Sequence, residues 1–378
     1  MSWQRIRGHD HLIQAFDHVF RRGRLAHAYL FTGPPGVGKR LFAGELAKAL
    51  LCEGRVSGEW SMVSGGTPDS RTHPHSAPST QAHSPLTTHH SLRLEACDRC
   101  PACALVEAGT HPDLQTARRP EGKSELPVES VRGLSRSLDL KPARGRGKIV
   151  ILDDADDLNE ESANCFLKTL EEPPPGALLI LIGTNADRQL PTIVSRCQVI
   201  HFRPLPEAIV ADLLAAQHIE DRAFIQRLAR LSGGSMGLAQ ALAEPQLWEF
   251  RLQLLQGLTR SPPDTIELAQ AWTKFVEEAG KETAAQRRRA SLVLHLLIDF
   301  LNDALSLSVG KSPRLTEEAD LPLLQKLVRQ VDADRLIQMS DRCLEADIQL
   351  DRYVQVVLVI EALLDALSIV LQTGEPVA

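Results

Sequence analysis

Three short runs of apolar residues stand out along the first half of the chain, at positions 28–32, 148–152 and 177–183. Each run is almost continuously apolar, which is the pattern of a strand buried on both faces of a parallel sheet. Residues 40–51, after the first run, and 160–172, before the third, show helical spacing instead. Strands that alternate with helices predict an α/β fold with a doubly wound parallel sheet.

Helical periodicity accounts for the rest of the chain. The predicted helix at 160–172 is preceded by Asn159, a residue type that commonly caps helices, and successive prolines at 173–175 end it. After Phe202 no strand pattern remains. Helical spacing continues to Leu371, with breaks at residues 233–234, 262–263 and 310–313 and around Asp351. The second half of the chain is therefore predicted to be helical.

These patterns predict three domains in a chain of 378 residues, a length that suits two or three cores. We expect an α/β domain at 1–203, a small helical domain at 204–243 and an all-helical domain at 245–378. Within the first domain, residues 53–94 are dominated by serine, threonine, proline and glycine and hold five of the thirteen histidines. Such a segment buries too little apolar surface to fold alone, so we predict a disordered insertion. An exposed loop explains its histidines better than a metal site does.

Charge and hydropathy argue against several classes of function. A formal net charge of −6 is unlike a self-sufficient DNA-binding surface, which is usually basic. The longest apolar stretch, 353–371, is interrupted by Gln355, Glu361 and Asp365 and predicts a buried helix rather than a membrane span. No apolar segment typical of a secretory signal opens the sequence, and we expect a cytoplasmic protein.

The segment GPPGVGKR, at 33–40, has the glycine pattern of a phosphate-binding loop and lies between a predicted strand and helix, as that motif requires. Its glycines let the backbone approach a phosphate: Gly33, Gly36 and Gly38. Lys39 is the residue that reaches the outer phosphates. Arg40 departs from the pattern, because a serine or threonine hydroxyl normally binds Mg²⁺ there and a guanidinium cannot bind a cation.

Polar residues follow the second and third predicted strands, at the edge of a parallel sheet where ligands bind. Asp153 is the acid that would support a metal through water, and Thr184 follows the third strand. Asp154 stands where hydrolytic nucleotide-binding proteins carry glutamate. A carboxylate misplaced by about 1 Å can lower a rate roughly a hundredfold. Positions 40 and 154 therefore both predict weak or absent ATP hydrolysis.

Four of the seven cysteines form a candidate metal site. Cys97, Cys100 and Cys103 are spaced as C-x-x-C-x-x-C, and Cys52 closes the helix after the glycine loop. In a reducing compartment such a cluster favours a metal over disulfides, and four thiolates suit a tetrahedral structural Zn²⁺. The long insertion between the first two ligands costs little, because loop-closure entropy grows only logarithmically with length.

Arg196 lies in the tripeptide Ser195-Arg196-Cys197, just before the apolar residues VIHF. Composition alone favours a solvated surface charge, which is the usual environment of arginine. The functional alternative is an arginine finger that acts in trans on the γ-phosphate of a neighbouring chain, where it would raise the rate by roughly 10³ to 10⁵.

Together these segments resemble the clamp-loader branch of the AAA+ ATPases, which belongs to bacterial DNA polymerase III. The resemblance rests on RLAHAYLFTGPPGVGKR, CDRCPAC, NCFLKTLEEPPPGALLILIGTN and LPTIVSRCQVIHF, and it covers most of residues 1–243. It implies a RecA-like AAA+ domain, a helical lid and a helical collar. It also implies a five-subunit ring with gamma/tau and delta subunits, which loads a sliding clamp on primer–template DNA. Because members with the Ser-Arg-Cys motif supply a finger to an adjacent ATP site, the resemblance reverses the interpretation of Arg196.

The resemblance further separates two kinds of subunit. A gamma/tau-type motor needs an intact loop, a glutamate in its second motif and an arginine in the lid. This chain has Arg40, Asp154 and, in the lid, Met236 and Gly237. These departures favour a stator that keeps zinc and the finger but hydrolyses little or no ATP, with ATP and Mg²⁺ binding left open. Any DNA polymerase (nucleotidyltransferase) activity would belong to the assembly.

Two alternatives remain open at this point. A gamma/tau-type ATPase motor would turn over ATP as a single chain, and Lys39→Ala would abolish that turnover. An independent zinc-dependent nucleic-acid-binding protein would bind DNA tightly with a steep salt dependence, although the acidic net charge disfavours it.

Overall fold

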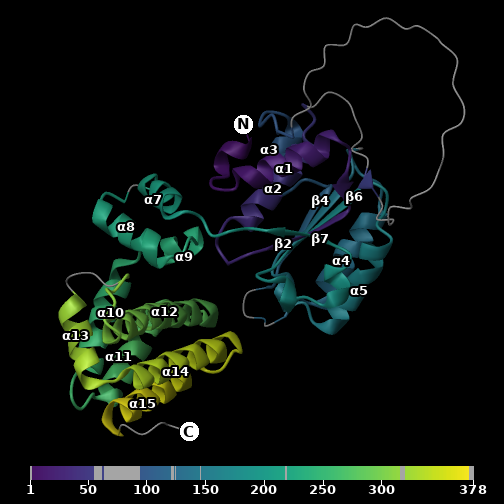
Figure 1. The fold of residues 1–378 in the computed structure, drawn as a ribbon. Helices are drawn as coiled ribbons and strands as arrows, with labels where there is room; N and C mark the ends of the chain where they lie inside the picture. The colour runs from purple at the N-terminus through teal and green to yellow at the C-terminus, as the bar shows by residue number, and fades with distance from the viewer. Residues whose placement is uncertain are drawn as a thin grey trace, which may run out of the picture. The chain divides into compact units, whose positions relative to one another are not determined.

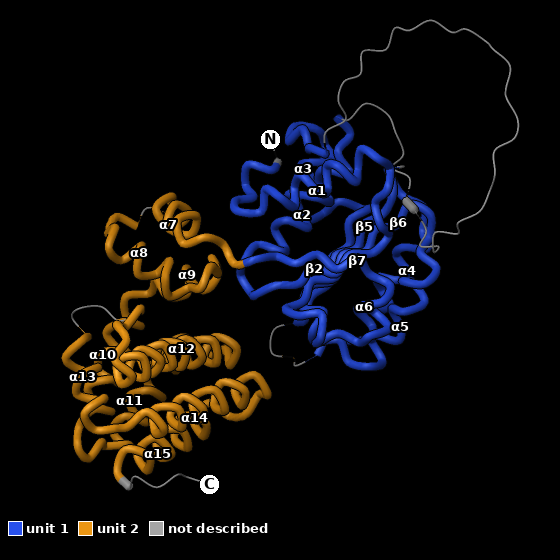
Figure 2. Tube along the Cα trace, in the orientation of Figure 1, with its two compact units in different colours: residues 1–120, 125–203 blue, residues 121–124, 204–378 orange. Residues whose placement is uncertain are grey.

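The computed structural model of the chain describes residues 2–54, 62–63, 94–120, 123, 125–144, 146–217, 219–315 and 320–373. The insertion predicted at 53–94 lies outside these residues, apart from Glu53, Gly54, Met62, Val63 and Leu94. Its five histidines lie outside them as well. The chain forms two compact units: unit 1 comprises residues 1–120 with 125–203, and unit 2 comprises 121–124 with 204–378 (Figure 1, Figure 2).

Unit 1 is built on a five-stranded parallel sheet in the order β4-β5-β6-β2-β7. Its strands are β2 (Ala28–Thr32), β4 (Leu114–Ala117), β5 (Lys148–Leu152), β6 (Ala177–Ile182) and β7 (Gln198–His201). A separate short parallel pair joins β1 (Leu25–Ala26) to β3 (Met62–Val63). The predicted α/β class and its three apolar strands are confirmed.

Helices cover both faces of this sheet (Figure 1). One face carries α1 (Asp10–Arg21), α2 (Lys39–Leu51) and α3 (Pro101–Glu107), and the other carries α4 (Val128–Asp139) and α5 (Glu160–Glu171). Short elements complete the unit: η1 (Ser2–Arg5), η2 (Ala155–Asp157), η3 (Ala186–Arg188) and α6 (Pro191–Val194). Consecutive residues of a strand pack on opposite faces of the sheet: Phe31 belongs to the hydrophobic core that includes α2, and Leu30 to the core that includes α5. This double burial explains why the central strands are continuously apolar.

Local details of unit 1 both support and correct the sequence prediction. Asn159 caps α5 as predicted, because its side chain accepts a hydrogen bond from the backbone N–H of Ser162. The apolar pattern does not predict β4, whose sequence LQTA lies at the edge of the sheet and is only partly buried. Helix α2, predicted from its helical spacing, buries Leu46, Leu50 and Leu51 but leaves Leu41 39% exposed.

Unit 2 contains only helices among its described residues. They are α7 (Glu207–Ala215), α8 (Arg222–Leu231), α9 (Met236–Ala241), α10 (Pro245–Leu258), α11 (Thr265–Glu277), α12 (Thr283–Ser308), α13 (Leu321–Gln330), α14 (Ala333–Asp351) and α15 (Val356–Thr373). The predicted breaks all fall between successive helices. One hydrophobic core runs through them from Leu205 to Val370.

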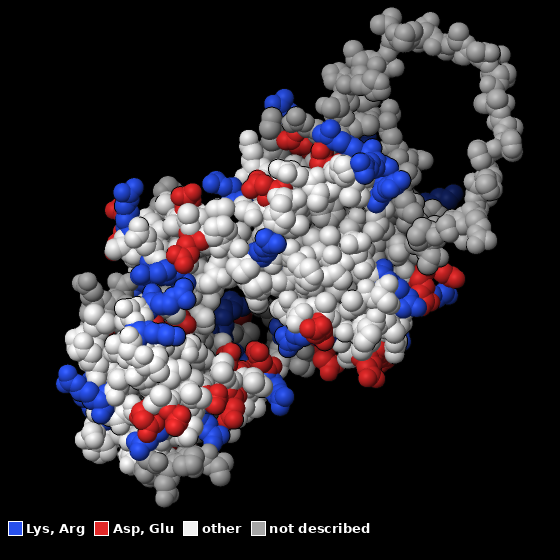
Figure 3. Space-filling view, in the orientation of Figure 1, with Lys and Arg blue, Asp and Glu red and all other residues white. Residues whose placement is uncertain are grey.

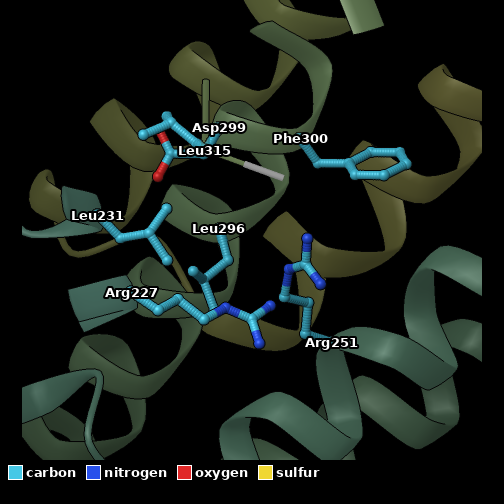
Figure 4. A pocket seen from close by; sticks show the side chains of 7 residues that line it. All are labelled: Arg227, Leu231, Arg251, Leu296, Asp299, Phe300 and Leu315. Atoms are coloured by element: carbon cyan, nitrogen blue, oxygen red, sulfur yellow. The ribbon is translucent and has the colours of Figure 1, made fainter. Parts of the chain in front are cut away.

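The predicted boundary between a lid and a collar, after residue 243, falls inside this shared core. Arg227 on α8 and Arg251 on α10 both form ion pairs with Asp320, at 3.3 and 2.7 Å. The Arg227 guanidinium also lies 3.9 Å from the centre of the Trp248 ring on α10. Both arginines line a small pocket with Leu231, Leu296, Asp299, Phe300 and Leu315 (Figure 4). These contacts join α8 to the helices that follow, and the separation of lid from collar stays a prediction.

One described helix, α12, is long and apolar enough by length and composition to span a membrane, with a mean hydropathy of 1.5 over its most apolar window. Half of that window is buried within the protein. Its residues Val293, Leu297 and Leu301 belong to the core of unit 2, where α12 packs against α14. Burial of this face is typical of a core helix. The segment predicted at 353–371 forms α15, another helix of the same core.

Candidate functional site

The glycine loop connects β2 to α2 with a backbone that only glycine adopts easily. Gly33 has a φ of 142°, and a Cβ at this position would lie 2.3 Å from the carbonyl oxygen of Phe202. Gly38 is the N-terminal cap of α2 with a φ of 100°. The Gly33 N–H donates to the carbonyl of Thr184 at 2.9 Å, which ties the loop to the end of β6. The loop therefore lies at the carboxyl edge of the sheet, as predicted.

Lys39 is turned back onto the loop itself. Its ammonium donates to the carbonyl of Pro34 at 2.7 Å and also to the carbonyl of Gly33. The residue is buried, and burial lowers the pKa of Lys39, against the opposing charges of Asp156 and Asp153. A phosphate group entering the loop would have to compete with these two carbonyls for the ammonium.

Arg40 pairs with the acid at the end of β5. Its Nη1 lies 3.6 Å from Oδ2 of Asp153. Burial and the adjacent charge of Asp154 raise the pKa of Asp153, while the Arg40 charge opposes that rise. A guanidinium is a pure donor, so it neutralises Asp153 without offering a ligand to a metal. Position 40 thus offers no hydroxyl to Mg²⁺, and the acid after β5 is paired with a positive charge of the chain itself.

Asp154 and Thr184, the other predicted residues at this end of the sheet, each form a hydrogen bond to a neighbouring aspartate. Asp154 takes a left-handed backbone conformation with a φ of 55°, and its N–H donates to Oδ1 of Asp153 at 3.2 Å. Asp156 accepts from both the N–H and the hydroxyl of Thr184, at 2.7 and 2.6 Å, and from the amide of Gln189 at 2.6 Å. No sequence motif points to Asp156, although it is the third acid of the segment LDDAD at 152–156. Its role is to fix the end of β6 against the end of β5.

The four predicted cysteine ligands come together, although one is distant in the sequence. Cys52 caps the C-terminus of α2 and Cys100 caps the N-terminus of α3. Cys97 precedes α3, and Cys103 lies in its first turn. All four Sγ atoms lie within 4.8 Å of one another. Two opposite edges, Cys52 to Cys100 and Cys97 to Cys103, measure 3.9 and 4.0 Å.

This spacing fits a metal ion at the centre of the four sulfurs. Zn–S bonds of about 2.3 Å in a tetrahedron place the sulfurs about 3.8 Å apart. Cys52 and Cys103 are buried and the other two are partly buried, and none of the four forms a disulfide. A site with four protein ligands and little exposure is typical of a structural metal centre rather than a catalytic one.

A buried lysine anchors the cysteine cluster to α2. Lys48, only 2% exposed, pairs with Glu45 of its own helix at 3.0 Å. It also pairs with Asp98, between two of the cysteines, at 2.8 Å and with Glu107 of α3 at 3.2 Å. Burial alone would lower the pKa of Lys48, but the hydrogen bonds to Asp98, Glu45 and Glu107 outweigh it and raise that pKa. Sequence patterns do not predict the role of Lys48, because only the fold brings Asp98 and Glu107 close to it.

Arg196 lies at the end of the sheet where the parallel strands begin, whereas the glycine loop lies at the end where they finish. β7 runs parallel to β2, with Gln198 beside Tyr29, so residues before β7 lie near the start of β2. The loop begins at Gly33, roughly 13 Å further along the strand. Within the described chain the side-chain contacts of Arg196 are with Glu171, Thr192 and Ser195, none of which belongs to the loop. The loop, Asp153, Asp154 and Thr184 form one site, and Arg196 is apart from it.

Comparison with known proteins gives consistent matches. A family model described as DNA polymerase III, delta subunit, matches residues 8–64 and 75–206. The DNA polymerase III subunit delta' of Escherichia coli (strain K12) is 29% identical over 84% of this chain and 80% of its own length. The subunit delta' of Pseudomonas aeruginosa is 33% identical over 66% of this chain and 67% of its own length. The subunit tau of Escherichia coli is 32% identical over 63% of this chain but only 32% of its own length.

Proposed function

The chain belongs to the family of DNA polymerase III delta' subunits, and from this membership we propose that it is the stator of a clamp-loader complex. In this role it joins gamma/tau and delta subunits in a five-membered ring in the cytoplasm. The ring places a sliding clamp on primer–template DNA, and ATP is hydrolysed by its neighbours rather than by this chain. Polymerase activity belongs to the holoenzyme that the ring serves.

The observation that carries the proposal is the contact between Arg40 and Asp153. Hydrolysis in a phosphate-loop site needs Mg²⁺ between the phosphates and the protein, held by a hydroxyl at position 40 and supported by the acid after β5. Here the hydroxyl is missing and its replacement pairs with that acid at 3.6 Å. Asp154, in place of a glutamate, also lacks the length to polarise an attacking water. Lys39 and the glycines can still hold a phosphate, so nucleotide binding without turnover is the expected behaviour.

Arg196 contributes to a neighbouring site in this proposal. Because it lies at the sheet edge opposite its own loop, it cannot serve the phosphates bound there. A partly exposed arginine at this edge is suited to act in trans, as a finger on the triphosphate of the adjacent ring member. The metal in the four-cysteine site is Zn²⁺ in a structural role, because four thiolates leave no open position for chemistry.

The second candidate function is a gamma/tau-type motor. The intact glycines, Lys39 and the similarity to subunit tau favour it. The Arg40–Asp153 pair argues against it, because position 40 lacks the hydroxyl that binds the metal of a motor and the supporting acid is already paired with a cation. An independent DNA-binding role is disfavoured by the net charge of −6, and acidic and basic side chains both occur on the face of each unit that Figure 3 shows.

The test is ATP turnover, measured on the isolated chain and on the chain assembled with its partners. We expect no turnover from the isolated chain and DNA-stimulated turnover from the assembly. Brisk hydrolysis by the isolated chain that Lys39→Ala removes would favour the motor instead. Failure of the chain to join gamma/tau and delta subunits in gel filtration would contradict both candidates.

A further inference from the structure

Arg196 is held in place by a carboxylate from another element of unit 1. Glu171 is the last residue of α5, and its Oε1 lies 2.6 Å from Nη2 of Arg196. The other terminal nitrogen, Nη1, donates to the carbonyl of Thr192 at 2.9 Å and to the hydroxyl of Ser195 at 3.2 Å. Ser195 is itself fixed, since its hydroxyl donates to the same Thr192 carbonyl at 3.1 Å. The guanidinium is therefore fixed from two sides.

Stability does not explain this arrangement. The side chains of Arg196 and Glu171 are 34% and 48% exposed, and ion pairs this exposed contribute little to folding. The C-terminus of a helix also favours a cation, whereas α5 ends with the acidic pair Glu171 and Glu172. An acid in an unfavourable place, in contact with the one arginine assigned to a neighbouring site, indicates a role in function.

We propose that Glu171 is a positioning residue that fixes the direction in which Arg196 is presented to the adjacent subunit. This inference rests on the proposed function of Arg196 as a finger in trans. A free arginine side chain samples many rotamers, and a finger that is already held loses less conformational entropy when the neighbour engages it. The guanidinium has five N–H groups, and the contacts with Glu171, Thr192 and Ser195 leave donors for a phosphate oxygen.

The positioning role predicts a change in kcat without a change in assembly. In the reconstituted complex, Glu171→Ala should lower the single-turnover rate of DNA-stimulated ATP hydrolysis at the adjacent site by roughly tenfold, because the finger is then misplaced. The KM for ATP should not change, since a finger acts mainly in the transition state. Glu172→Ala is the matched control, because it removes the same charge from the same helix end and leaves the Arg196 contact intact.

A double variant separates positioning from a general electrostatic effect. If Glu171 acts through Arg196, the variant Glu171→Ala/Arg196→Ala should be no slower than Arg196→Ala alone. Circular dichroism and gel filtration of each variant check that folding and ring assembly are retained.

The rates of these variants distinguish the positioning role of Glu171 from the finger role of Arg196. Equal rates for Glu171→Ala and Glu172→Ala, or a faster rate for Glu171→Ala than for wild type, would overturn the positioning role and leave the finger assignment intact. An unchanged rate for Arg196→Ala would overturn the proposed role of the arginine, and the positioning role with it.

Discussion

The guanidinium of Arg40 lies 3.6 Å from the carboxylate of Asp153, so a positive charge fixed to the chain stands beside the acid that would support a metal. The charge balance of a phosphate site is partly kept, but its chemistry is not, because a guanidinium donates hydrogen bonds and cannot coordinate a water or phosphate oxygens as a metal ion does. In the proposed function, the fold of a nucleotide-binding protein is thus retained while hydrolysis is left to the neighbouring subunits.

Replacing Arg40 with threonine should make nucleotide binding depend on Mg²⁺. The new hydroxyl and the freed Asp153 could then hold the cation, and we expect ATP to bind on the order of tenfold more tightly in Mg²⁺ than in EDTA. Wild type should show no such difference. Titration with a fluorescent ATP analogue measures it, and Arg40→Lys, which keeps the charge without a hydroxyl, should behave like wild type. An equal Mg²⁺ dependence in wild type would contradict the idea that Arg40 excludes the metal.

Removing the finger should slow hydrolysis by the neighbour without disturbing assembly. For Arg196→Ala we expect the rate of ATP hydrolysis at the adjacent site to fall by a factor of at least about 10³. The steady-state ATPase rate of the complex should fall by the fraction of the total that this site contributes. Arg203→Ala is the matched control, since Arg203 is an exposed arginine that lies beyond the other end of β7. Quenched-flow measurement of ATP hydrolysis by the reconstituted ring gives the rate. A ring with Arg196→Ala that hydrolyses ATP at the wild-type rate would refute the assignment.

Removing the metal should destabilise unit 1. The purified chain is expected to contain one Zn²⁺, and a chelator or the double change Cys97→Ser/Cys100→Ser should lower the melting temperature of unit 1, because metal binding is coupled to folding. Elemental analysis and differential scanning calorimetry measure the two effects. Cys165→Ser, on α5 outside the cluster, should keep the zinc. Full stability in the absence of any metal would show that the cysteines pack without one.

Lys48→Met should be among the more destabilising single changes in unit 1. It leaves Glu45, only 3% exposed, with Arg5 at 3.1 Å as its remaining cation. Breaking a buried ion pair costs about 3 to 5 kcal/mol, and the Arg5 contact should reduce the loss in the free energy of unfolding to about 2 to 3 kcal/mol. Urea denaturation measures this loss. Lys168→Met, an exposed lysine of α5, should change it by less than about 0.5 kcal/mol.

The same lysine predicts how this difference depends on pH. Because the carboxylate partners raise the pKa of Lys48 in the folded state, its contribution is complete below the unfolded value of about 10.4 and is lost only as the pH rises through the folded value. The difference between wild type and Lys48→Met should therefore be the same at pH 7 and pH 9. A difference that shrinks over this interval would mean that Lys48 is not held in its charged form.

The sequence by itself determined the parts of this protein that depend on short-range patterns. The central strands are recognisable because burial on both faces requires a continuous apolar run, and the cap at Asn159 because capping involves residues three positions apart. The glycine loop follows from the backbone conformation that its residues allow. The cysteine cluster is predictable for a similar reason, since three of its four members lie within one short motif.

Only the tertiary structure decided which side chains meet. The edge strand β4 has no apolar run because one of its neighbours is solvent, and the exposure of Leu41 depends on what packs against α2. The pairing of Arg40 with Asp153, of Lys48 with Asp98 and of Arg196 with Glu171 joins residues from separate elements. No periodicity encodes such contacts, because they follow from the order and direction of the strands. That same order places Arg196 at the edge of the sheet away from its own loop.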